Sequence, residues 1–241
     1  MENRSWLSKL GTLNVKEPTK SENLTAYLIE AIVEGELPSG SKISEPDLSR
    51  RLGVSRGPLR EALMRIEALG LIERIPHVGA KVIELSLHRL VELYAVREAL
   101  EGMAARLAAR HITLDEVQAL EALLKAHGEH IVNVSGASYF HQQGDFDFHY
   151  RIIQASRNGQ LKLLLCDELY HLLRMYRYQS PRYRSAPQEA LQEHLGILRA
   201  IRQGDEELAE LLMRRHISGS RLLIEQQFDL PHTNESSVGS L

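Results

Sequence analysis

The sequence predicts a mainly α-helical protein, in which a small unit of helices and a β-hairpin precedes a longer all-α bundle. Three observations support this prediction. Two short amphipathic helices with a tight turn between them are expected at 47–74, in DLSRRLGVSRGPLREALMRIEALGLIER. Two short strands are expected within 71–84, around the turn at 76–79. From 87 to 228, apolar residues recur at helical spacing, and no alternating, strand-like run interrupts them.

The turn between the first two helices has the residues that such a turn requires. The first helix, at 47–52, carries Leu48 and Leu52 on one face. Gly53 then lies where a helix end favours a left-handed residue. Ser55 is a suitable N-cap for the second helix, and Pro58 lies in its first turn, where a missing N–H group does no harm. The order therefore predicts a helix-turn-helix.

The second helix has one apolar face and one basic face. Its apolar face consists of Leu59, Ala62, Leu63 and Ile66. The arginines at 56, 60 and 65 point elsewhere. With the hairpin that follows, this layout is typical of a winged helix-turn-helix, whose second helix enters the major groove of DNA. A basic face on an isolated helix is also compatible with simple solvation.

The charge of the whole chain does not indicate nucleic-acid binding. The protein has 241 residues and a formal net charge of −3. Residues 50–65, however, contain five arginines and a single acidic residue, Glu61. A local excess of this kind can contact phosphates while the rest of the protein stays acidic.

The amino-acid sequence of the first unit also resembles that of a known protein family. The stretch ELPSGSKISEPDLSRRLGVSRGPLREALMRIEALGLIERIPHVGAKV, within 21–85, resembles the DNA-binding domain of GntR-family transcription regulators. The resemblance implies a double-stranded DNA operator as partner. A single short recognition helix reads too few base pairs for a genome, so a homodimer on two half-sites is expected. Relatives with this motif often carry an arginine where this chain has Pro46. The candidate DNA-contacting residues are Arg50, Arg51, Ser55, Arg56, Gly57, Arg60, Arg65, His77 and Gly79.

The chain divides into four regions. We expect a mobile arm at 1–20, the winged helix at 21–85, an all-α domain at 86–228 and a disordered tail at 229–241. No apolar run approaches the roughly 18 residues that span a bilayer, and the first 20 residues lack a secretory pattern. Cys166 is a lone cysteine, so no internal disulfide forms, and a cytoplasmic location fits.

The second domain is expected to contain six helices. Their predicted ranges are 87–110, 113–130, 139–156, 160–180, 187–203 and 205–228, and Thr113 with Glu116 forms a capping box. Short connections favour antiparallel neighbours in a bundle. The stretches LYAVREALEGMAARLAA, GDFDFHYRII, EHLGIL and MRRHI resemble the FCD branch of the GntR regulators.

A metal site is the main chemical prediction for this domain. Asp145 and His149 are four residues apart and share a helix face. Spacing alone proves nothing, because the chain has four such acid–histidine pairs and chance predicts about 1.5. The FCD resemblance implies a divalent metal held by Asp145, His149, His194 and His216. Zinc is the first choice, with nickel, iron or manganese as alternatives.

The arginines of the bundle are candidates for binding an anion. Arg97 lies among apolar residues, and its partner is either Glu101 at i+4 or the carboxylate of a ligand. The resemblance places Arg97 at the effector pocket, with Glu101 beside it. Arg174 and Arg177 form either a second anion clamp or a solvated helix face. A further resemblance, to regulators that accompany methylcitrate-cycle genes, implies a tricarboxylate effector.

These features predict a DNA-binding transcription regulator, a repressor whose operator affinity falls when a small carboxylate binds near the metal. Two alternatives stay open. The metal itself is the signal in a metal-sensing regulator, whereas an open metal site with a nearby carboxylate base would serve a metalloenzyme. Against an enzyme, the sequence offers no nucleophile–base constellation, and no membrane partner is expected.

Overall fold

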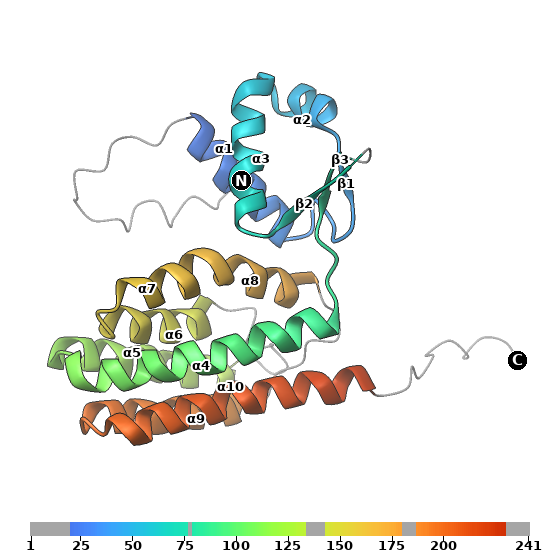
Figure 1. Cartoon of the computed structure of the whole chain (residues 1–241). Helices are drawn as coiled ribbons and strands as arrows, with labels where there is room; N and C mark the ends of the chain where they lie inside the picture. The colour runs from blue at the N-terminus through green and yellow to red at the C-terminus, as the bar shows by residue number, and fades with distance from the viewer. Residues whose placement is uncertain (1–19, 77–78, 134–142, 180–186, 230–241) are drawn as a thin grey trace, which may run out of the picture.

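The computed structural model describes residues 20–76, 79–133, 143–179 and 187–229. The predicted arm and tail therefore lie outside the described residues, apart from Lys20 and Asp229 at their inner ends. Figure 1 shows a mixed helical and β unit above a layered helical bundle. The upper unit is formed by the N-terminal part of the chain, and the bundle is formed by the part that follows. The protein is mainly helical, with an N-terminal winged helix-turn-helix and a helical C-terminal domain, as the sequence predicts.

The first unit consists of three helices and a small antiparallel sheet. Its elements are α1 (Lys20–Val33), β1 (Lys42–Ile43), α2 (Glu45–Leu52), α3 (Arg56–Ala68), β2 (Ile72–Ile75) and β3 (Gly79–Val82). The strand order is β1-β3-β2. In the hairpin, Ile72 pairs with Val82 and Ile75 pairs with Gly79, which places the wing at the far end of β2 and β3.

Local capping explains where the helices of the first unit begin and end. The hydroxyl of Ser44 accepts a hydrogen bond from the Asp47 N–H, and α2 therefore begins two residues before the predicted start. Gly53 ends α2 with φ of 63°, the left-handed conformation that glycine adopts without strain. Ser55 is at the N-cap of α3 with an extended backbone, although its side chain makes no capping hydrogen bond.

The core of the first unit lies between α1, α3 and the sheet. The predicted apolar face of α3 is buried, because Leu59, Ala62, Leu63 and Ile66 are each no more than 1% exposed. These side chains pack against Leu28 and Ile32 of α1 and Ile72 and Val82 of the sheet. Burial of this face fixes the opposite face of α3 toward solvent.

The second unit is a helical bundle. Its elements are α4 (Leu87–His111), α5 (Leu114–Asn133), α6 (Gln143–Ala155), α7 (Gly159–Lys162), η3 (Leu163–Glu168), α8 (Leu169–Gln179), α9 (Pro187–Arg202) and α10 (Glu206–Asp229). The two long helices α4 and α10 pack along each other (Figure 1). Helix α6 packs on α4 and α5, while α9 packs on α4, α5 and α10.

Most helix ends of the bundle agree with the predicted ones within one or two residues. The capping box before α5 forms, because the Thr113 N–H donates to Glu116 Oε2 and the Glu116 N–H donates to Thr113 Oγ1. The predicted helix at 160–180 differs, since a π-helical turn, η3, separates α7 from α8. No proline or glycine marks this turn inside the sequence, so local signals do not predict it.

Helix α8 lies between the bundle and the first unit (Figure 1). It packs on α1, and two of its side chains reach across to the first unit. Arg174 binds Glu30 of α1 through two hydrogen bonds. The Gln179 amide donates to the Ile32 carbonyl and accepts from the Ser39 N–H. The first unit is therefore held to the bundle by polar contacts as well as by chain connectivity.

Candidate functional site

The outer face of α3 is the first candidate site. Ser55, Arg56, Gly57, Arg60 and Arg65 are all exposed there, opposite the buried apolar face. The first turn of α3 also has N–H groups without partners inside the helix, which favour contact with phosphate. This surface has the chemistry of a recognition helix, with guanidinium groups for base edges and a positive helix end for the backbone.

Several arginines of this surface are paired with acidic side chains of the same unit. Arg60 donates from Nε to Glu45 Oε2 at 2.9 Å, and Arg65 binds Glu61 at 2.8 Å. Arg50 of α2 binds Asp47. These pairs are solvent-exposed, so each contributes little stability and leaves the guanidinium available for DNA.

The wing adds one further position. Gly79 has φ of 99°, and a Cβ built at this residue meets nothing within 4 Å. The glycine is therefore required by the backbone conformation, not by crowding within the protein. His77, the other predicted wing residue, lies outside the described residues.

Three histidines converge inside the bundle and form the second candidate site. His149 comes from α6, His194 from α9 and His216 from α10. They are 4%, 0% and 5% exposed, respectively. His194 also stacks on the Phe148 ring, with 4.1 Å between ring centroids. The structure thus brings together three of the four predicted metal ligands from helices distant in sequence.

The ring nitrogens of these histidines are spaced for a shared metal ion. His194 Nε2 and His216 Nε2 are 3.1 Å apart, and His216 Nε2 and His149 Nε2 are 3.3 Å apart. Zinc–nitrogen bonds of about 2.0–2.1 Å in a tetrahedral site place neighbouring ligand nitrogens about 3.3 Å apart. The donor set and its spacing therefore fit a divalent metal, although imidazoles alone do not select one.

Two carboxylates approach the outer nitrogens of this cluster. Glu101 Oε2 of α4 lies 2.5 Å from His149 Nδ1, and Glu193 Oε2 of α9 lies 2.6 Å from His216 Nδ1. Ligating histidines commonly direct their second nitrogen at such a carboxylate. The three histidines and two carboxylates, here called the histidine centre, draw on α4, α6, α9 and α10.

Arg97 completes the inner side of the histidine centre. Its Nε lies 2.6 Å from Glu101 Oε1, and both side chains are buried. Its guanidinium also lies over the Tyr94 ring, 4.9 Å from the centroid. Burial would raise the pKa of Glu101, but the charge of Arg97 and the hydrogen bonds from Arg97 and His149 outweigh it and lower the pKa to about 2. Glu101, one of the two partners that the sequence left open for Arg97, pairs with it in the structure.

The remaining predicted residues divide into two groups. Asp145 lies one turn before His149 on α6, and Arg177 lies on α8, but their side chains fall outside the described part of the chain. Arg174 binds Glu30 of the first unit, and its ring contacts are with Tyr170 and Tyr178. This side chain therefore links the two units in the structure.

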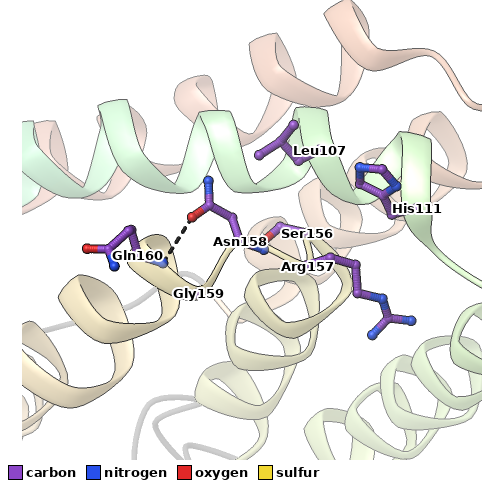
Figure 2. Close-up of a pocket in the computed structure, with 7 residues that line it drawn as sticks. All are labelled: Leu107, His111, Ser156, Arg157, Asn158, Gly159 and Gln160. Atoms are coloured by element: carbon purple, nitrogen blue, oxygen red, sulfur yellow. Dashed lines mark hydrogen bonds between the residues drawn. The ribbon is translucent and has the colours of Figure 1, made fainter.

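A separate open pocket of about 440 Å³ lies between α4 and the turn from α6 to α7. Figure 2 shows that Leu107 and His111 line it from α4, opposite Ser156, Asn158 and Gln160. Asn158 caps α7 by accepting from the Gln160 and Leu161 N–H groups. No predicted metal- or effector-binding residue lines this pocket, so it is distinct from the histidine centre.

Sequence reasoning missed Glu193 and the contact between Glu101 and His149. Glu193 is adjacent to His194 in the sequence, yet it contacts His216, which is 23 residues away. Helical periodicity assigns residues to faces but does not state which helices meet. A carboxylate next to a predicted ligand was the only available signal.

Comparisons with known proteins agree with this architecture. The family model of the gntR family of bacterial regulatory proteins matches residues 20–82, and the FCD domain model matches residues 92–219. The chain belongs to the GntR family. Its second domain is an FCD domain, and members of this family are DNA-binding transcription regulators.

Individual GntR-family relatives cover most of the chain. A protein of Paenarthrobacter nicotinovorans described as a probable D-xylose utilization operon transcriptional repressor is 31% identical, over 83% of this chain and 86% of its own length. The transcriptional repressor RspR of Escherichia coli K12 is 30% identical, over 83% and 87%. Both relatives are described as transcriptional repressors, which favours a transcription regulator over the metalloenzyme alternative.

Solved structures share the fold. The structure described as E. coli McbR/YncC superposes with a TM-score of 0.69 and 21% identity, covering 88% of this chain and 100% of the other. Among the described residues of this GntR regulator, no helix is long and apolar enough to cross a membrane.

Proposed function

We propose that this protein is a homodimeric repressor whose affinity for its operator falls when a small carboxylate binds at the histidine centre. The observation that carries the DNA-binding part is the exposed arginine face of α3, opposite a fully buried apolar face. The names of the two relatives support repression in preference to activation.

DNA recognition is assigned to α3 and its neighbours. Arg56 and Arg60 contact guanine edges in the major groove, where a bidentate pair contributes about 1–3 kcal/mol of discrimination. Ser55, Gly57 and Arg65 hold α3 against the DNA backbone. Arg50 and Arg51 contact DNA phosphates. The wing, with His77 and Gly79, approaches the adjacent groove. One helix reads few base pairs, so two copies on two half-sites are required.

The histidine centre is the proposed metal site. His149, His194 and His216 would hold the ion, with Asp145 as the fourth protein ligand. A divalent ion there would supply a positive charge for an anionic effector. The effector residues proposed with it are Arg97, Glu101, Arg174 and Arg177. A carboxylate effector would compete with Glu101 for Arg97, since the structure pairs these two side chains.

Two finer proposals concern the signal. A tricarboxylate of the methylcitrate type offers several carboxylates for a metal and arginines together. Alternatively, the metal itself is the signal, in which case the metal alone changes operator affinity. Both are compatible with a centre buried among α4, α6, α9 and α10.

Helix α4 is the proposed route from the centre to DNA. It carries Arg97 and Glu101 and begins at Leu87, four residues after the buried Ile83 that follows the wing. An effector changes DNA affinity only if it binds the two forms of the protein unequally. A tilt of α4 would change the separation of the two recognition helices and weaken binding to half-sites of fixed spacing. The expected loss of affinity is about 5–150-fold.

The test begins with selection of operator sequences from a random DNA pool. Wild type should enrich a two-fold symmetric site, and Arg60→Ala should lose preference at one base position per half-site. Arg202→Ala, an exposed arginine at the end of α9, is the control and should bind as wild type does. Unchanged preference of Arg60→Ala would contradict the assignment.

The signal is then tested on the selected operator. EDTA, zinc, and zinc with citrate or 2-methylcitrate are added in turn. Release by zinc alone identifies a metal sensor, whereas release only with the carboxylate supports the carboxylate effector. Absence of any response would retire the effector proposal while leaving DNA binding in place.

A further inference from the structure

The histidine centre contains two carboxylates that do not face its middle. Glu101 and Glu193 each contact the Nδ1 atom of one histidine, on the side away from the converging Nε2 atoms. We propose that Glu101 and Glu193 are positioning residues, which fix the tautomers of His149 and His216 so that both Nε2 lone pairs point at a shared cation. This inference rests on the metal site of the proposed function and goes beyond its ligands.

The argument starts from the hydrogen-bonding capacity of the groups. An ionised carboxylate only accepts hydrogen bonds, so the imidazole nitrogen that contacts it must carry the proton. For His149 and His216 this nitrogen is Nδ1. In a neutral imidazole with a proton on Nδ1, Nε2 has a lone pair and no proton. Each carboxylate therefore prepares the opposite nitrogen of its ring as a ligand.

The two prepared nitrogens lie close together. His149 Nε2 and His216 Nε2 are 3.3 Å apart, so their lone pairs are directed into the same small, buried space. Two lone pairs at this distance repel unless a cation or a proton lies between them. His194 Nε2, 3.1 Å from His216 Nε2, extends the same arrangement. Three histidines alone do not determine where their lone pairs point. The two carboxylates direct the lone pairs inward and so make the centre favourable for a cation.

The two carboxylates differ in how they are held. Glu101 is buried, and Arg97 binds its second oxygen at 2.6 Å, so its orientation is fixed from behind. The side chain of Glu193 is 49% exposed. Glu193 lies on the solvent-facing side of α9 and directly precedes His194. Arg97, Glu101 and His149 form an ordered chain of contacts, whereas Glu193 holds His216 from the solvent side.

The difference in exposure determines which variant gives a clean test. Glu193→Ala removes the contact to His216 without leaving an unpaired charge in the core. Glu193→Gln retains an oxygen that can accept from Nδ1. Glu189→Ala is the matched control, because Glu189 lies on the same helix one turn earlier and is exposed.

Zinc affinity is the first readout, measured by competition with a chelator on metal-free protein. Loss of an outer partner of a ligating histidine typically weakens binding about 10–100-fold. We expect this loss for Glu193→Ala, partial recovery for Glu193→Gln, and wild-type affinity for Glu189→Ala. Equal zinc affinity of Glu193→Ala and Glu189→Ala would overturn the proposal for Glu193.

The tautomer of His216 is the second readout, and it does not depend on zinc. Long-range ¹H–¹⁵N spectra of histidine-labelled, metal-free protein should show His216 protonated on Nδ1 in wild type. In Glu193→Ala the signals should shift toward the Nε2-protonated form. An unchanged tautomer would overturn the positioning role, and so would a wild-type His216 protonated on Nε2.

Glu101→Gln tests the second carboxylate with the same two readouts on His149, and Glu98→Gln on α4 is its control. Whether the wild-type protein binds zinc distinguishes an error in the positioning role of the carboxylates from an error in the proposed metal site. If wild type binds zinc and neither Glu193→Ala nor Glu101→Gln weakens it, only the positioning role is wrong. If wild type binds no zinc and the tautomers are mixed, both are wrong.

Discussion

Arg174 of the FCD domain and Glu30 of the DNA-binding domain form a two-pronged ion pair between the two domains. Arg174 Nη1 lies 2.6 Å from Glu30 Oε1, and Arg174 Nη2 lies 2.7 Å from Glu30 Oε2. Paired hydrogen bonds of this kind fix direction as well as distance. The orientation of α1, and of α3 packed against it, is therefore tied to α8.

The first prediction concerns this link. Glu30→Ala and Arg174→Ala should each loosen the contact between the domains, and the double variant should add little further effect. Because Glu30 is 43% exposed at its side chain, a coupling energy of about 1 kcal/mol is expected. A double-mutant cycle on the free energy of unfolding measures it. Strictly additive effects would show that the pair contributes nothing to domain docking.

The second prediction is the pH dependence of the same pair. The hydrogen bond from Arg174 lowers the pKa of Glu30 below its usual 4.5, against the opposing effect of burial. A carboxyl group with a lowered folded-state pKa stabilises the fold above the unfolded-state pKa, and the contribution is lost as pH falls through the folded-state value. The difference in Tm between wild type and Arg174→Ala should thus be full at neutral pH and shrink below about pH 4.5.

The matched control for this titration removes the carboxyl group itself. In a Glu30→Gln background, Arg174→Ala should change Tm by the same small amount at every pH. A difference that persists unchanged in acid for the wild-type background would contradict the assignment of the pH dependence to Glu30.

What the sequence could predict follows from the range of the interactions. Gly53 ends α2, and Thr113 with Glu116 begins α5, as predicted, because these signals act within one helical turn. The i,i+4 pair of Arg97 and Glu101 was one of two predicted alternatives for the same reason. Local periodicity is sufficient for such contacts.

Contacts between distant segments were not predictable in this way. Glu30 and Arg174 are 144 residues apart, and Glu193 meets His216 only because α9 and α10 pack together. The histidine set was recovered only through family resemblance, since spacing alone also gave Glu73 with His77. Which helices contact each other depends on tertiary packing, and the residues within one helical turn do not determine it.

The third prediction separates two kinds of arginine in the DNA-binding domain. Arg60→Ala should relax the base preference of the operator, with a loss of about 1–3 kcal/mol at one position. Arg51→Ala should weaken binding to all sequences about equally and reduce the salt dependence by about one phosphate contact. Titrations of cognate and scrambled operators at several salt concentrations distinguish the two. Identical profiles for both variants would reject the division into base and phosphate contacts.

The fourth prediction concerns metal retention. Protein purified without chelators should hold about one divalent ion per chain, because three buried imidazole nitrogens converge in a space of metal-ligand size. His194→Ala should lose the ion, while His88→Ala, an exposed histidine of α4, should keep it. Elemental analysis measures both. Zinc at 100 times its Kd should stabilise wild type by about 2.7 kcal/mol, and the same zinc should leave His194→Ala unchanged.

The fifth prediction separates the structural role of Arg97 from its proposed role toward an effector. Arg97 and Glu101 are both 3% exposed, so Arg97→Met removes the charged partner of a buried carboxylate, which keeps only its contact with His149 Nδ1. Breaking a buried pair from one side typically costs about 3–5 kcal/mol. The double variant Arg97→Met/Glu101→Leu removes both charges, and its stability should recover toward wild type. Urea denaturation of the metal-free proteins measures these free energies.

Zinc binding by the same variants completes the argument. The double variant should regain stability but not zinc affinity, because His149 has lost the carboxylate that contacts its Nδ1 atom. A loss of effector response in Arg97→Met supports a direct role of Arg97 only if the zinc affinity and the stability of the same variant are also measured. If the double variant is both stable and as tight for zinc as wild type, Glu101 has no part in the metal site, and the pair serves the fold alone.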